Sequence, residues 1–156
     1  AEAASYISAP EIKGADEVAA EYKETKDFPQ DELVLLFSAA GWKSANYPEK
    51  LARALKNSSQ VISAWDGDKL VGLVRGLDDG ELTAFLHYML VDPDYQKEHI
   101  GSGLLTRILA KYRKMLYVKA IPSKPEVVPF FEKFGFVHYD NYTAMQIQNF
   151  DKSTDC

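Results

Sequence analysis

The stretch between residues 82 and 114 constrains the fold of this chain more than any other. It opens with the apolar run Leu82–Val91, a predicted strand that Asp92-Pro93 should end, because proline cannot continue a strand ladder. A polar loop follows. From Ile100 onward, apolar residues then recur every three or four positions, as on the buried face of an amphipathic helix. A strand, a short loop and a helix in this order are typical of a mixed α/β domain.

Shorter apolar segments, separated by glycine, proline and asparagine, predict the other elements. In chain order these are a strand at Ala20–Thr25, helices beginning near Pro29 and Pro48, strands at Val61–Trp65, Leu70–Leu77 and Met115–Ile121, a helix over Pro125–Phe134, and a hairpin of Phe136–Tyr139 with Tyr142–Ile147. This order predicts one α/β domain over residues 1–156, with about four helices and a mixed sheet of about six or seven strands. Residues 1–18 are weakly patterned and are expected to form a peripheral N-terminal arm.

Composition excludes several classes of function. Of the 156 residues, 46% are hydrophobic and 26% charged, which is the profile of a globular domain. No apolar run reaches the roughly 18 residues of a membrane span, and no signal peptide is visible, so we expect a cytoplasmic protein without a membrane partner. The net charge of −5 argues against a nucleic-acid partner. The one cysteine is the last residue and no metal-ligand spacing occurs, so no metal is expected.

The predicted helix start combines two features of an anion site. Gly101 and Gly103 let a ligand approach the backbone, and the first N–H groups of a helix have no partner within it. A pyrophosphate fits such a helix start, and a tight turn without a ligand is the alternative. Residues 96–133 also hold 8 basic and 3 acidic residues, an excess that fits a small anionic ligand or a solvated helix face. The glycine spacing of a dinucleotide-binding unit and the Gly-Lys-Ser/Thr of a phosphate-binding loop are both missing.

Residues 91–105 resemble motif A of the GCN5-related N-acetyltransferases, which reads Gln/Arg-x-x-Gly-x-Gly/Ala after a strand ending in Val-x-Pro. Gln96 and Gly101 match its first and last positions, whereas His99 stands where its first glycine is usual. Residues 129–136 are similar to the family's Phe-Tyr-x-Lys-x-Gly-Phe helix, with Phe131 at the tyrosine position, and the hairpin ending at residues 65–72 is also family-like. The resemblance covers roughly residues 20–150, and the strand pattern is similar to that of the arylalkylamine and plastid-type branch.

The resemblance implies a GNAT-like fold of mostly antiparallel strands with a splayed parallel pair, here Leu82–Val91 and Met115–Ile121. Acetyl-CoA would bind in the V-shaped gap between them. Strand backbone would pair with the pantetheine arm, loop N–H groups would hold the pyrophosphate, and a phenylalanine would pack near the sulfur. The implied cofactor-binding residues are Met89, Leu90, Val91, Gln96, Lys97, Glu98, His99, Ile100, Gly101, Ser102 and Phe131.

The implied reaction moves an acetyl group directly from acetyl-CoA to a primary amine. The ammonium must first lose a proton, and His87, with a reference pKa near 6.5, is the candidate base. It aligns with a histidine that the arylalkylamine branch uses in proton removal. A structural histidine is the alternative role, and Glu81 is the rival base.

Phe131 cannot protonate the leaving thiolate, as the family tyrosine would. Tyr88, Tyr95 or a water would replace it, unless the thiolate leaves unaided. Phe131 and His99 are also the residues that favour the alternative function, a non-catalytic acyl-CoA-binding sensor or interaction module.

The acceptor, a small-molecule or peptide amine, is expected at residues 41–47 and the last hairpin. Trp42, Tyr47 and Tyr142 there form either an apolar or cation-binding wall or ordinary core aromatics. The acidic N-terminal third favours a cationic acceptor by long-range steering. The resemblance also makes a homodimer plausible.

Overall fold

The computed structural model describes residues 19–150. They fall into two units, one ending at Ala120 and the other beginning at Ile121. The predicted arm of residues 1–18 lies outside the described residues. None of the helices in the described range has the length and apolar character of a membrane span.

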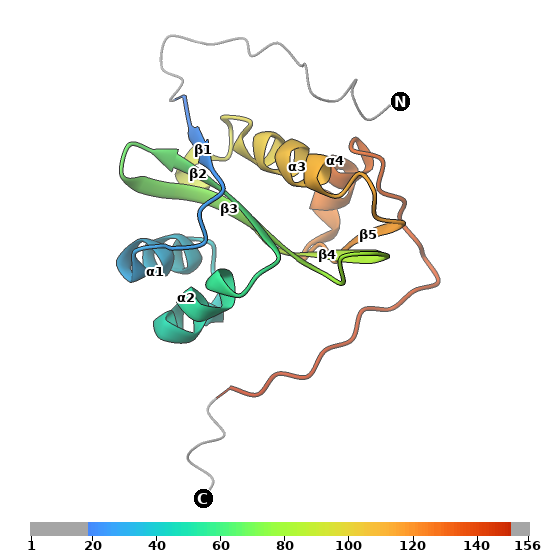
Figure 1. Cartoon of the computed structure of the whole chain (residues 1–156), viewed down its shortest axis with the longest axis horizontal. Helices are drawn as coiled ribbons and strands as arrows, with labels where there is room; N and C mark the ends of the chain where they lie inside the picture. Colours follow the sequence, from blue (N-terminus) through green and yellow to red (C-terminus); the bar gives the residue numbers. More distant parts are fainter. Residues whose placement is uncertain (1–18, 151–156) are drawn as a thin grey trace, which may run out of the picture. The chain divides into compact units, whose positions relative to one another are not determined.

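The first unit is built on one mixed sheet of five strands in the order β1-β2-β3-β4-β5 (Figure 1). Neighbours from β1 to β4 are antiparallel, whereas β5 runs parallel to β4. The strands are β1 (Glu21–Lys23), β2 (Gln60–Asp66), β3 (Lys69–Asp78), β4 (Thr83–Val91) and β5 (Tyr117–Ala120). The predicted mixed α/β class, with one parallel pair, is therefore confirmed.

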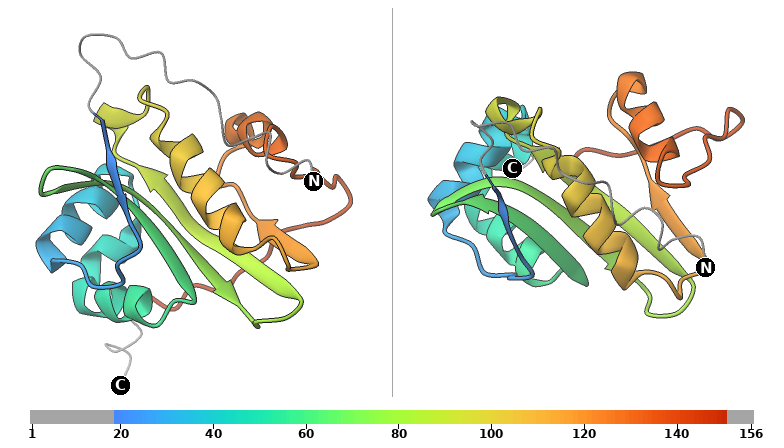
Figure 2. Two further views of the ribbon diagram at one scale, coloured as in Figure 1. Left: turned by 45° about the horizontal axis from the view of Figure 1, so that its top comes forward. Right: turned by 90° about the horizontal axis from the view of Figure 1, so that it is seen from above.

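Helices cover both faces of this sheet (Figure 2). On one face lie α1 (Gln30–Ala39) and α2 (Pro48–Lys56), joined by the short 3-10 helix η2 (Lys43–Asn46). On the other lies α3 (Ile100–Lys111), which follows β4 through the 3-10 helix η3 (Pro93–Tyr95). Proline favours the starts of α1 and α2, because its fixed φ suits the first helical turn.

Each face of the sheet has its own apolar core. Leu33, Phe37 and Leu55 are fully buried between α1, α2 and the sheet. On the opposite face, α3 buries four apolar residues at the spacing that its sequence pattern predicts. Gly76 of β3 permits this packing, because a side chain there would run into the ring of Tyr112 at the end of α3.

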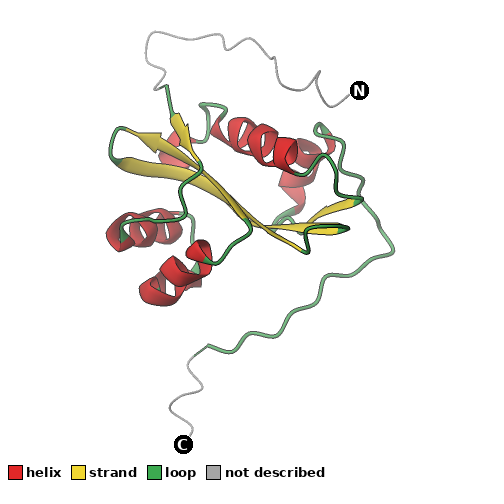
Figure 3. Cartoon of the chain, in the orientation of Figure 1, coloured by secondary structure: helices red, strands yellow, loops and turns green. Residues whose placement is uncertain are grey.

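The second unit contains two short helices and a long coil (Figure 3). η4 (Pro125–Val127) and α4 (Val128–Glu132) stand where one helix was predicted. The predicted hairpin of residues 136–147 is wrong: this segment is coil, and Met145 and Ile147 are 90% and 85% exposed. An isolated hairpin is marginal in water unless one face is buried, and residues 137–147 are all exposed. The described sheet therefore has five strands, fewer than predicted.

Candidate functional site

The parallel pairing between β4 and β5 covers all of β5 but only the first part of β4. Residues Thr83 to Leu86 pair with Tyr117 to Ala120, and the pairing stops there, although β4 continues to Val91 (Figure 2). Met89, Leu90 and Val91, the predicted partners of the pantetheine arm, all lie on this part of β4 beyond the last β5 pair. No strand of the described chain pairs with this edge of β4 beyond Leu86.

A β-bulge in β4 marks the point where this pairing ends. Arg75 pairs with His87 and Val74 pairs with Met89, so Tyr88 is an extra residue without a partner on β3. Tyr88 has a φ of 55°, in the left-handed region. A bulge bends its strand and raises the local twist. The pairing itself ends at Ala120, which is the last residue of β5.

The start of α3 follows directly from the free end of β4. Its N-cap residue is His99, with φ 58° and ψ 21°, so histidine adopts the left-handed conformation at the position where the resemblance expects glycine. No side chain caps the helix, which leaves the N–H groups of its first turn for another partner. Gln96, Lys97 and His99 are exposed, Gly101 and Ser102 are half-buried, and the side chain of Ile100 is buried in the core.

Glu98, in the loop before α3, has a carboxylate oxygen that is unsatisfied within the described chain. One of its carboxylate oxygens is buried and accepts no hydrogen bond from the described part of the chain. A carboxylate here competes with any other anion for the positive end of α3.

A polar cluster stands beside the bulge, on the sheet face covered by α1 and α2. His87 and Arg75 are directly opposed in register, so their side chains share one face. Arg75 Nε and Nη2 lie 3.1 and 2.6 Å from His87 Nδ1. Burial, and secondarily the charge of Arg75, lowers the pKa of His87 to about 4. The imidazole is therefore neutral at pH 7, but it is a much weaker proton acceptor than its reference pKa implies.

Tyr88 joins this cluster to the predicted acceptor loop. Its hydroxyl is hydrogen-bonded to Ser44 Oγ, and its ring meets that of Trp42 edge-on at 5.0 Å. The Arg75 guanidinium stacks over the same ring at 5.0 Å, and the His87 ring lies 4.0 Å away. Of the predicted acceptor wall, the structure therefore brings Trp42 to the bulge. Tyr142 belongs to the second unit, where its ring stacks on that of Tyr139.

The remaining predicted residues lie elsewhere. Glu81 is exposed in the β3–β4 turn, where its amide donates to Asp79. Tyr95 donates to Asp66 at 2.7 Å, and this bond raises the pKa of Tyr95 to about 12, which makes it a poor acid. Phe131 is buried within the second unit between the rings of Phe130 and Phe136, at 5.5 and 5.3 Å.

Arg75 was not among the predicted site residues, and Ser44 was included only as part of the predicted acceptor loop at residues 41–47. The signal for Arg75 was a single charged residue inside the apolar run Leu70–Leu77, which predicts a partner for that charge. Ser44 carried no such signal, because a serine in a loop is usually solvated.

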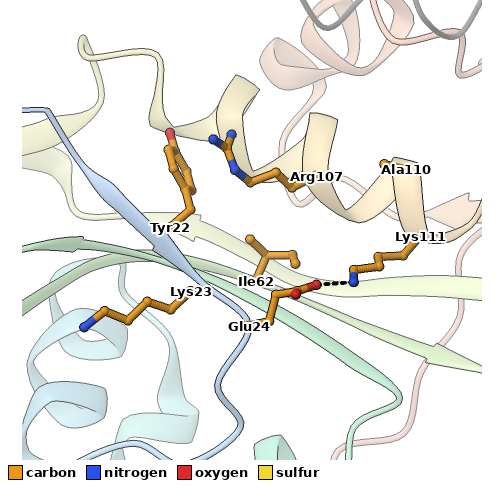
Figure 4. Close-up of a pocket in the computed structure, with 7 residues that line it drawn as sticks. All are labelled: Tyr22, Lys23, Glu24, Ile62, Arg107, Ala110 and Lys111. Carbon is orange, nitrogen blue, oxygen red and sulfur yellow. Dashed lines mark ion pairs between the residues drawn. The ribbon is translucent and has the colours of Figure 1, made fainter.

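A separate cavity of about 300 Å³ lies between β1 and α3 (Figure 4). Ile62 forms its floor, Arg107 stacks on Tyr22 at 3.7 Å, and Lys111 is paired with Glu24. Arg107 also donates to a backbone carbonyl of α3, so its charge is used internally. Among residues 19–150, no group of three or more histidine, cysteine or acidic residues is placed to hold a metal ion.

The match to a family model identifies the class of this protein. The model of the acetyltransferase (GNAT) family matches residues 21–136, and the chain belongs to this family. The sheet topology, the single parallel pair and the resemblance of motif A agree with this assignment. Membership indicates acyl transfer.

The individual relatives share less than a third of their residues with this chain over the aligned region. Over 117 residues the chain is 29% identical to GCN5-related N-acetyltransferase 2, chloroplastic, of Arabidopsis thaliana, which covers 70% of this chain and 45% of that protein. It is 27% identical to a protein of Glycine max named histone acetyltransferase TAP1, over 67% of this chain and 50% of that protein. The chain thus spans about half the length of these curated relatives. A solved GNAT family acetyltransferase of Streptococcus pneumoniae superposes with a TM-score of 0.72 at 28% identity, over 85% of this chain and 100% of the other.

Proposed function

We propose that this protein transfers an acetyl group from acetyl-CoA directly to a primary amine. The observation that carries the proposal is the free edge of β4 beyond Leu86, which leads straight to the uncapped start of α3. A pantetheine arm needs backbone groups of an open strand edge, and a pyrophosphate needs the N–H groups of a helix start. Family membership supplies the reaction class.

Each part of the co-substrate then has its own partners. Backbone groups of Met89–Val91 pair with the pantetheine, and N–H groups of residues 97–102 hold the pyrophosphate. Gln96 borders that loop. Phe131 is our proposal for the sulfur end, as the resemblance implies, and Phe131→Tyr tests it. The variant speeds turnover if proton delivery to the thiolate limits the rate and changes it little if amine deprotonation does, whereas a large loss of activity shows that Phe131 is needed as an apolar packing surface.

The acceptor meets the thioester beside the bulge, against Tyr88 and Trp42. Its nitrogen attacks the thioester carbon, an N–C bond forms, and the C–S bond breaks with its electron pair on sulfur. His87 is the candidate catalytic residue for this step. Small-molecule and peptide amines are both open as acceptors, and the name of the Glycine max relative supports a protein amine.

The decisive experiment measures thiol release from acetyl-CoA over a panel of amines, with calorimetric binding of acetyl-CoA alongside it. Amine-dependent release of CoA supports the enzyme. Tight binding without turnover supports the alternative of a non-catalytic acyl-CoA sensor, which His99 and Phe131 favour as departures from the family motifs.

The assembly and compartment are also proposals. We propose a cytoplasmic protein that forms a homodimer, with the plastid as the alternative compartment because one relative is named chloroplastic. Sedimentation at two concentrations tests the dimer, and cell fractionation tests the compartment.

A further inference from the structure

The contact between Arg75 and His87 determines where the imidazole carries its proton. Two guanidinium nitrogens of Arg75, Nε and Nη2, lie 3.1 and 2.6 Å from His87 Nδ1. Arginine has only donors, so Nδ1 must be the acceptor. A neutral imidazole that accepts at Nδ1 carries its hydrogen on Nε2. The lone pair that a general base needs is therefore already occupied.

Arg75 is itself held in place from two elements. Its third nitrogen, Nη1, lies 3.4 Å from both the carbonyl of Ala54 in α2 and the hydroxyl of Ser58. Its plane stacks over the ring of Tyr88, whose hydroxyl is bound to Ser44. Neither Arg75 nor His87 forms an ion pair with a carboxylate of residues 19–150. The guanidinium thus has no competing anion to draw it away from Nδ1.

The Nε2 atom of His87 is the ring nitrogen that remains for a ligand. His87 is half-buried at the first position after the last β4–β5 pair, beside the bulge. Within the described chain, only the Nδ1 atom of its ring is hydrogen-bonded. A neutral N–H donor without a partner, fixed at the edge of the proposed thioester site, is suited to an oxygen that gains negative charge.

We propose that Arg75 is a positioning residue that locks His87 in the Nε2–H tautomer, and that His87 donates a hydrogen bond to the thioester oxygen instead of removing the proton of the amine. The neutral amine attacks the carbonyl carbon, and the carbonyl electron pair moves onto oxygen, where the Nε2–H group stabilises it. The C–S bond then breaks as the carbonyl re-forms, and the CoA thiolate leaves. The nitrogen passes its extra proton to water.

The electrostatics of the cluster agree with this assignment. The groups that face the ring are Arg75 from β3 and Phe85 and Tyr88 from β4 itself. Burial and the Arg75 charge both disfavour imidazolium, as the lowered pKa of His87 reflects. The same uncompensated positive charge disfavours an ammonium ion beside it, so the acceptor reacts as the neutral amine.

The first test reads the tautomer directly and needs no activity. The chain has 3 histidines, so the ring nitrogens of a ¹⁵N-histidine sample can be assigned with single His→Gln variants and followed by long-range ¹H–¹⁵N correlation. We expect His87 to show one protonated nitrogen, Nε2, and no titration between about pH 5.5 and about pH 8. A proton on Nδ1 of His87, or a titration of His87 near pH 6.5, overturns the proposal, and the parent protein is sufficient for this test.

Variants of Arg75 provide the second reading. Arg75→Gln should raise the pKa of His87 toward its ordinary value and mix the two tautomers, because glutamine can donate or accept at Nδ1. Arg53→Gln on α2 is the matched control: Arg53 is exposed and pairs with Glu49, so the same loss of charge should leave His87 unchanged. If Arg75→Gln is folded by its melting temperature and His87 keeps the parent spectrum, Arg75 has no positioning role. If the variant does not fold, Arg75→Lys, which keeps the charge but not the fork, should show a mixed tautomer, and a parent-like spectrum contradicts the proposal.

Kinetics then tests the catalytic part, which rests on the proposed acetyl transfer. His87→Ala should lower kcat by about 10²- to 10³-fold. His87→Gln, which keeps an N–H donor but has no basic nitrogen, should stay within about tenfold of the parent. The pH at which kcat/KM rises should follow the pKa of the chosen amine when a less basic amine is used. Equal losses of kcat in the His87→Ala and His87→Gln variants refute hydrogen-bond donation by His87. A rise of kcat/KM with pH that does not depend on the pKa of the amine refutes it as well. An absence of any transfer refutes the proposed function, while the tautomer measurement still judges the role of Arg75.

Discussion

Replacing His99 with glycine should stabilise this protein, although the change deletes a side chain. His99 has φ 58° and is exposed, and its side chain caps no backbone group of α3. A left-handed conformation costs an L-residue about 1–2 kcal/mol, which glycine avoids. Glycine loses about 0.5–1 kcal/mol more backbone entropy on folding than a residue with a side chain. The difference between the midpoints of these ranges predicts a gain of about 0.75 kcal/mol in the free energy of unfolding for His99→Gly.

His99→Ala is the matched control, because it removes the imidazole but keeps the Cβ that makes this conformation costly. Urea unfolding should rank glycine above histidine, and alanine at or below histidine, with equal m-values. Acetyl-CoA affinity, measured by calorimetry, should be retained or improved in the glycine variant, since the backbone of the loop is the proposed anion site. If alanine stabilises as much as glycine, the gain comes from the lost imidazole and the argument from backbone conformation fails.

Three further outcomes follow from the same geometry. Gly101→Val should weaken acetyl-CoA binding on the order of tenfold or more, because a branched side chain blocks close approach to the backbone. Lys97→Ala removes only a screened charge and should weaken binding less. If calorimetry shows the larger loss of affinity for Lys97→Ala, the backbone anion site is contradicted. Gly76→Ala should cost about 1–3 kcal/mol of stability by urea unfolding, since the added methyl group meets the ring of Tyr112, and an unchanged midpoint would disprove that close packing. The folded-state pKa of His87, about 4, lies below the ordinary 6.5, so the unfolded chain binds the proton more readily. His87 therefore lowers the free energy of unfolding as pH falls from about 6.5 through about 4. Parallel curves of unfolding free energy against pH for the parent and His87→Gln would rule out this contribution.

Local patterns predicted most of the fold because each depends on neighbours in sequence. The spacing of apolar residues from Ile100 gave α3 its buried face, and the alternation and turn residues around Gly67 predicted the β2–β3 hairpin. The hairpin predicted at residues 136–147 carried the same kind of signal and did not form. Alternation shows that a segment can bury one face. It does not show that a surface is present to receive it.

The candidate site was easiest to predict where it follows the chain. Residues 89–102 run continuously from strand to loop to helix, so a motif could point to all of them. Arg75 and His87 are twelve positions apart and meet only through the register of β3 and β4. That register depends on the bulge at Tyr88, and nothing in the residues around Tyr88 predicts a left-handed φ for a tyrosine.

The bulge in β4 lies between the proposed co-substrate site and the polar cluster around His87. Without the extra residue, side chains would alternate strictly along β4, and His87 and Tyr88 would point to opposite faces. With it, both rings lie on the α1–α2 face at 4.0 Å, where Arg75 contacts both of them. The same irregularity falls where the pairing with β5 ends and the edge proposed for the pantetheine begins. One backbone irregularity therefore gathers the polar cluster beside the point where β5 ends and the proposed co-substrate site begins.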